Sequence, residues 1–188
     1  MATKNEFHDK DNSILEKIFK NVNDWLSFAE KKNTTILSVF GFITIFSVLN
    51  FVKEFSSADI FMKVGSGIYL ISYVVVLVSS IVSLMPVTNI QEKLINGDKD
   101  KKIKGTDNLW FYGDIIKYNM GEYKTALSKK GCCDFDEVYE QLISQIIVNS
   151  HIASKKYACF KVSSWSIAIG IIGSIGCFFI SICTNPVT

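Results

Sequence analysis

The chain has 188 residues, of which 48% are hydrophobic and 20% are charged, and only two are prolines. This composition excludes a disordered or a collagen-like chain. The charged residues leave three long gaps, at 33–52, 64–91 and 162–188. Each gap is long enough for a helix that spans the hydrocarbon core of a bilayer, which takes about 20 apolar residues. The sequence therefore predicts an integral membrane protein with three transmembrane helices.

Residues 12–32 have the pattern of an amphipathic helix, because apolar side chains recur every three or four positions. The stripe comprises Ile14, Ile18, Val22, Trp25 and Ala29. Ser13 and Glu16 have the spacing of a capping box, which predicts the start of the helix there. No proline or glycine separates this helix from the first gap, so we expect it to continue into a transmembrane segment at 34–52.

The middle of the chain begins after a second span at 64–87, which ends at Pro86. Residues 97–105 are rich in lysine and aspartate between two glycines, which is typical of a solvated loop. A second amphipathic helix is predicted from Phe135, and it runs without a breaker into the third span at 162–183. Its expected stripe comprises Phe135, Val138, Leu142, Ile146, Ala153, Tyr157 and Phe160.

The lysines predict the orientation of these spans. Residues 1–33 contain six lysines, the 53–63 loop two, residues 88–161 twelve and the tail none, and the chain has no arginine. Because basic residues favour the cytoplasmic side, the N-terminus and the long middle segment are expected inside the cell and the C-terminus in the periplasm. The predicted fold is an all-α membrane protein whose outer helices extend into a small helical cytosolic domain. The predicted parts are a cytosolic amphipathic helix (1–33), transmembrane helix 1 (34–52), an external loop (53–63), transmembrane helix 2 (64–87), a cytosolic sensor region (88–161), transmembrane helix 3 (162–183) and an external tail (184–188).

Patterns that indicate catalysis are missing from the sequence. His8 and His151 lack a second metal ligand at helical spacing, and His151 is expected on an exposed face. Neither a phosphate-binding loop nor a nucleophile elbow occurs. Gly170, Gly173 and Gly176 lie in an apolar span, where glycines indicate close helix packing. We predict that the protein is not an enzyme and needs neither a metal nor a cofactor.

Aromatic and charged residues cluster between residues 110 and 124. The cluster comprises Trp110, Phe111, Tyr112, Asp114, Tyr118, Tyr123 and Lys124. A nucleotide binds to such a mixture, because a ring stacks on the base and cations attract the phosphate. A membrane-interface belt or the core of the cytosolic part has the same composition. The pattern alone favours a belt or a core over a nucleotide site.

Two residues of the second amphipathic helix also allow two interpretations. Asn149 is a polar residue on an apolar stripe, where it either fixes the register of packed helices or hydrogen-bonds a ligand. Lys156 either extends to the membrane surface or faces a ligand.

Three pieces of the chain resemble, in order, the Pycsar transmembrane effector family. They are residues 23–33 (NDWLSFAEKKN), residues 111–115 (FYGDI) followed by Glu122 and Tyr123, and residues 142–157 (LISQIIVNSHIASKKY). The resemblance covers nearly the whole chain. It implies a bacterial anti-phage effector of the inner membrane that senses cyclic CMP or cyclic UMP and then impairs that membrane, with growth arrest or abortive infection as the result.

The resemblance also implies a set of ligand-binding residues and partners. The residues at matching positions are Trp25, Lys31, Asn33, Tyr112, Asp114, Tyr123, Asn149, Lys156 and Tyr157, to which the aromatic cluster adds Lys124. The expected partners are a cyclic pyrimidine mononucleotide, the lipid bilayer and further copies of the chain, without a nucleic-acid polymer. The alternatives are a constitutive membrane scaffold that binds a protein partner, and a related pore-forming effector that answers a different nucleotide.

Overall fold

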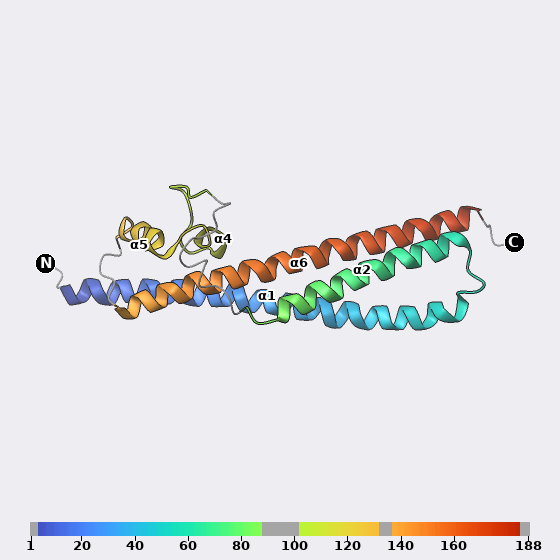
Figure 1. Ribbon diagram of the computed structural model, residues 1–188, viewed down its shortest axis with the longest axis horizontal. Helices are drawn as coiled ribbons and strands as arrows, with labels where there is room; N and C mark the ends of the chain where they lie inside the picture. The colour runs from blue at the N-terminus through green and yellow to red at the C-terminus, as the bar shows by residue number, and fades with distance from the viewer. Residues whose placement is uncertain (1–3, 88–101, 132–136, 185–188) are drawn as a thin grey trace. The chain divides into compact units, whose positions relative to one another are not determined.

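The computed structural model describes residues 4–87, 102–131 and 137–184, with side chains from residue 13 onward. Its helices are α1 (Lys4–Glu54), α2 (Ile60–Leu84), α4 (Tyr112–Ile115), α5 (Met120–Ser128) and α6 (Glu137–Thr184) (Figure 1). None of the described residues is in a β-strand. The predicted all-α fold is therefore confirmed. The chain divides into a first unit, residues 1–29 and 86–156, and a second unit, residues 30–85 and 157–188.

Helices α1 and α6 each contribute to both units without a break. Each amphipathic helix was expected to continue into a transmembrane segment, because no glycine or proline separates the two. The continuous helices α1 and α6 confirm this prediction. The predicted capping box is wrong, because α1 already begins at Lys4 and Ser13 lies inside it. Residues 4–12 contain no helix breaker, so the helix extends beyond the apolar stripe. Residues 97–101 and Phe135, about which the sequence also made predictions, lie outside the described residues.

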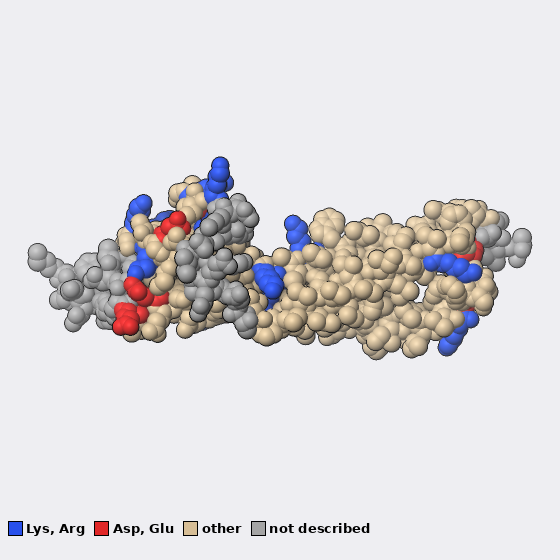
Figure 2. All heavy atoms as spheres, viewed as in Figure 1, with Lys and Arg blue, Asp and Glu red and all other residues tan. Residues whose placement is uncertain are grey.

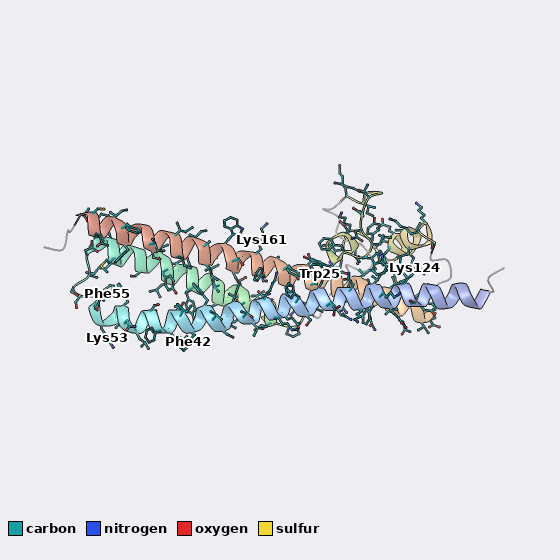
Figure 3. All side chains as sticks on the ribbon, turned by 180° about the vertical axis from the view of Figure 1, so that it is seen from behind. Trp25, Phe42, Lys53, Phe55, Lys124 and Lys161 are labelled. Atoms are coloured by element: carbon teal, nitrogen blue, oxygen red, sulfur yellow. The ribbon has the colours of Figure 1, made fainter. Side chains whose placement is uncertain are left out.

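The second unit consists of apolar helices. Segments of α1, α2 and α6 are each long and apolar enough to cross a membrane. Large apolar side chains face outward along them, including Phe42, Ile71 and Ile172, which are 74%, 69% and 70% exposed. Phe42 points away from the neighbouring helices (Figure 3). On the face shown in Figure 2, charged side chains of this unit lie toward its ends. Such a surface is stable in lipid, and the chain is a membrane protein.

Within the second unit, α2 and α6 pack closely through small residues. A methyl group added to Gly170 would lie 2.7 Å from Ser72 Cβ, and one added to Gly65 would lie 2.8 Å from Cys177 Cβ. The Ser79 hydroxyl donates a hydrogen bond to the Cys159 carbonyl oxygen on α6 at 3.0 Å. The packing role predicted for the glycines of α6 is confirmed for Gly170.

Gly173 of α6 also packs closely, since an added methyl group would lie 3.0 Å from Ile68 Cγ2. The same prediction is wrong for Gly176, around which 4 Å of space is open. Only the first two glycines lie on the side of α6 that faces α2.

Helix α1 packs on α2 in the second unit through a hydrogen bond and aromatic rings. The hydroxyls of Thr44 and Tyr69 are 3.0 Å apart and hydrogen-bonded. The Phe40 ring packs on Tyr69 and Tyr73, with ring centroids 5.7 and 6.1 Å apart. Since Thr44 is only 1% exposed, this hydrogen bond satisfies a buried hydroxyl.

The core of the first unit joins α1, α5 and α6 with the segment between residues 109 and 118. Its buried members are Leu15, Ile18, Val22, Leu109, Ile115, Tyr118, Tyr123, Leu127, Ile143, Ile146 and Ile147. The predicted stripe of the second amphipathic helix is wrong at Val138, which is 69% exposed. The stripe is right at Ile146 and Ala153, which are buried, and the buried face of α6 also includes Ile143, Ile147 and Ser150.

Candidate functional site

Local hydrogen bonds fix the first turn of helix α5 in the first unit. In α5, the Asn119 side chain accepts from Glu122 N at 2.9 Å, and Glu122 Oε2 accepts from Asn119 N at 2.9 Å. These reciprocal bonds form a capping box. After the helix, Gly131 has a φ of 99°, a conformation that favours glycine. Helix α5 therefore has defined ends, with Lys129 and Lys130 beyond its last turn.

A buried carboxylate, Asp107, organises the segment before α4. It accepts hydrogen bonds from Lys104 N at 2.8 Å, Lys117 Nζ at 2.7 Å and the Tyr118 hydroxyl at 3.1 Å. Lys117 Nζ also donates to Asp114 Oδ1 at 2.5 Å, and Asp114 Oδ2 accepts from Asn108 N at 3.0 Å. One ammonium group thus bridges two carboxylates.

The pKa values in this network follow from its hydrogen bonds. Burial raises the pKa of Asp107, but the donors Lys104 N, Lys117 and Tyr118 outweigh burial and lower it below its ordinary value. The hydrogen bond from Lys117 lowers the pKa of Asp114 as well. Burial, with the hydrogen bond to Asp107, raises the pKa of Tyr118 to about 12. At neutral pH the two carboxylates are therefore ionised and the phenol is protonated.

A cavity of about 880 Å³ lies between the segment around Asp107 and helix α5. Its described lining is Ile103, Lys104, Gly105, Asp107, Leu109, Tyr118, Gly121, Glu122, Thr125, Ala126, Lys129 and Lys130. The volume falls within the range of ligand sites, about 300–1,000 Å³. Among the described residues, Lys104, Lys129 and Lys130 make no ion pair. The cavity thus combines ammonium groups with carboxylates, an aromatic ring and apolar side chains.

A second feature is an aromatic group on α1 and α4. The Trp25 ring lies 6.0 Å from Phe111 and 5.8 Å from Tyr112, and the rings of Phe111 and Tyr112 are 4.6 Å apart. The Asn21 side chain donates to the Trp110 carbonyl oxygen at 2.6 Å and fixes this segment on α1. Trp25 is labelled in Figure 3. The structure therefore brings together Trp25 and Tyr112 of the predicted binding residues.

Three other predicted residues of the first unit take part in its packing. Tyr123 is fully buried, and its hydroxyl donates to the Leu109 carbonyl oxygen at 2.7 Å. Lys124 forms an ion pair with Glu140 of α6. The Asn149 side chain donates to Asn23 Oδ1 of α1 at 2.8 Å, as expected of an amide that fixes the register of packed helices.

The remaining predicted residues are divided between the units. Lys156, which is 7% exposed, belongs to the first unit. Lys31, Asn33 and Tyr157 belong to the second unit, where Lys31 is exposed and Asn33 is buried. The structure does not place the ten residues in one site of either unit.

The structure corrects one prediction, for His151, and adds two residues, Asp107 and Lys117. The prediction that His151 is exposed is wrong, because its exposed fraction is 7%. Asp107 and Lys117 were not singled out, although the spacing of Asp114 and Lys117 is that of an ion pair on one helical turn. Among the described residues, no group of three or more metal-ligating side chains could hold a metal ion.

Comparisons with known proteins give the family of the chain. The model of the Pycsar effector protein domain matches residues 14–183, which include parts of both units. No curated protein and no solved structure matches the chain. Since the family model covers most of the sequence, the chain belongs to the Pycsar effectors, a family of transmembrane effectors in anti-phage defence.

Proposed function

We propose that a cyclic pyrimidine mononucleotide, cyclic CMP or cyclic UMP, activates this protein, which then impairs the bacterial inner membrane. The family match over residues 14–183 carries the proposal. The resemblance in the sequence implies the messenger, and the growth arrest or abortive infection that follows. We further propose that the first unit is cytosolic, because residues 88–161 contain twelve of the twenty lysines.

The division of the chain into two units supports this function. The first unit contains a charged cavity of about 880 Å³, as a sensor of a small anion requires. The second unit contains helices that are apolar enough to cross a membrane. Helices α1 and α6 belong to both units, so a change in the position of either helix in the first unit has a covalent path into the membrane. We propose that further copies of the chain join in the membrane to produce the lesion.

The function is tested in bacteria that produce the protein together with a pyrimidine nucleotide cyclase. A dye that reports membrane potential should show depolarisation only when the cyclase is active. The matched control is a cyclase with an inactivated catalytic site, which makes no messenger but leaves protein production unchanged. Depolarisation with both cyclases would contradict activation by the nucleotide and favour a constitutive role, and depolarisation with neither would contradict the effector function.

A further inference from the structure

We propose that the activating nucleotide binds in the cavity between residues 103–109 and helix α5, with its phosphate at Lys129 and Lys130 and its base toward Tyr118 and Glu122. This inference rests on the proposed function and names the site at which it begins. None of the ten predicted binding residues is among the described residues that line this cavity.

The charges of the cavity fit a small monoanion. A cyclic mononucleotide has one negative charge on its phosphodiester, so two ammonium groups are sufficient to bind it. Lys104, Lys129 and Lys130 line the cavity and make no ion pair among the described residues, so binding the phosphate would break no ion pair. Lys124, in contrast, is already paired with Glu140.

Other lining residues fit a pyrimidine. Cytosine has an exocyclic amine and uracil has a ring N–H, and each of these donates a hydrogen bond. The Glu122 carboxylate accepts one backbone hydrogen bond, from Asn119 N, and a carboxylate offers about four lone-pair positions in total. Leu109 and the Tyr118 ring supply apolar surface in the same cavity. A base in this position has both a hydrogen-bond acceptor and surface to pack on.

The same wall connects the cavity to the rest of the first unit. Tyr118 and Asp107 line the cavity and are hydrogen-bonded to each other, and Lys117 joins Asp107 to Asp114 of α4. Tyr118 also belongs to the hydrophobic core that contains α1 and α6 side chains. An occupant of the cavity therefore contacts residues that are packed on the helices leading to the membrane.

The site is tested by calorimetric binding of cyclic CMP and cyclic UMP to the full chain in detergent. The variant Lys129→Gln/Lys130→Gln should weaken binding about tenfold or more, because it removes the charge-assisted hydrogen bonds to the phosphate. The matched control is Lys17→Gln/Lys20→Gln, which removes the same charge from exposed positions of α1 that do not line the cavity.

A second pair of variants tests the site without a change of charge. Thr125 lines the cavity and is exposed, so Thr125→Trp should fill the space and abolish binding. Ser128→Trp, on the same helix but outside the lining, should bind as the unchanged chain does. Circular dichroism and thermal unfolding establish that each variant is folded.

The outcomes separate the inference from the function on which it rests. If the unchanged chain binds a cyclic pyrimidine nucleotide and the cavity variants bind it equally well, the cavity is not the site and the proposed function stands. If the unchanged chain binds no cyclic mononucleotide, both are overturned. Loss of binding in the cavity variants alone supports the inference.

Discussion

At the scale of single residues, Lys117 joins two carboxylates of the first unit. Its ammonium group donates to Asp107 and Asp114, whose side chains are only 4% and 25% exposed. Without the cation, two carboxylates would face each other in a partly buried site. Removing one partner of a buried ion pair typically costs about 3–5 kcal/mol, and the partial exposure of Asp114 places the expected cost at the low end.

The variant Lys117→Met should therefore unfold at a lower temperature than the unchanged chain at pH 7. The two carboxyl groups have lowered pKa values in the folded chain, so their stabilisation is present above an unfolded value of 3.8 and is lost as the pH falls through the folded values. Between pH 7 and pH 5 they should therefore not change the stability of the unchanged chain.

In Lys117→Met the pKa of Asp107 should rise, because burial is no longer opposed by the ammonium group. The melting temperature of this variant relative to the unchanged chain should then increase from pH 7 to pH 5. Lys102→Met, which alters an exposed lysine, is the control and should match the unchanged chain at both pH values. An equal deficit of Lys117→Met at both pH values would contradict the bridging role.

The sequence predicted the aromatic and charged cluster of the first unit but not the cavity beside α5. The aromatic and charged residues between 110 and 124 stood out because they are close together in the chain. Their division into core residues such as Tyr123 and surface residues such as Trp110 depends on α1 and α6, which are distant in sequence. The cavity could not be predicted, because its walls are formed by two segments that meet only in the fold.

At the scale of elements, the contact between α2 and α6 depends on the absence of a side chain at Gly170. The nearest atoms are Ser72 Cβ and Oγ, and the position of Cβ is fixed by the backbone of α2. Small residues at such positions allow helices in membranes to approach closely. The spacing of glycines predicted this packing, but only the structure distinguishes Gly170 from Gly176.

The variant Gly170→Ala should destabilise the chain by about 1–3 kcal/mol, as overpacking of a close contact does. Gly176→Ala is the matched control in the same helix, and it should have no such effect because the added methyl group meets no atom within 4 Å. Ser72→Gly introduced together with Gly170→Ala should restore part of the loss. Thermal unfolding in detergent measures all three, and an equal effect of the two alanines would contradict the packing.

At the scale of the whole molecule, the three long apolar segments were the most predictable feature. A gap in the charges is a property of composition over about 20 residues and does not require knowledge of contacts between distant segments. The orientation rests on the distribution of lysines, which is a bias of membrane insertion and not a feature of the packed structure. The orientation of the helices in the membrane is therefore tested in cells.

Labelling of single cysteines should establish the orientation. In a chain whose own cysteines are replaced by serine, Ser57→Cys in the turn between α1 and α2 should react with a membrane-impermeant maleimide in intact spheroplasts. Lys130→Cys, beyond the end of α5, should react only after the membrane is opened. The reverse pattern would place the first unit on the periplasmic side.

Helix α1 runs without a break from residues of the first unit to residues of the second. Leu15, Ile18 and Val22 are buried in the first unit, and Phe40 and Thr44 are buried in the second. One residue inserted between Ala29 and Glu30 would rotate one set relative to the other by about 100° and separate them by about 1.5 Å. The number of residues at this junction therefore determines the angle between the two buried faces of α1. Insertions and deletions change that angle, and substitutions do not.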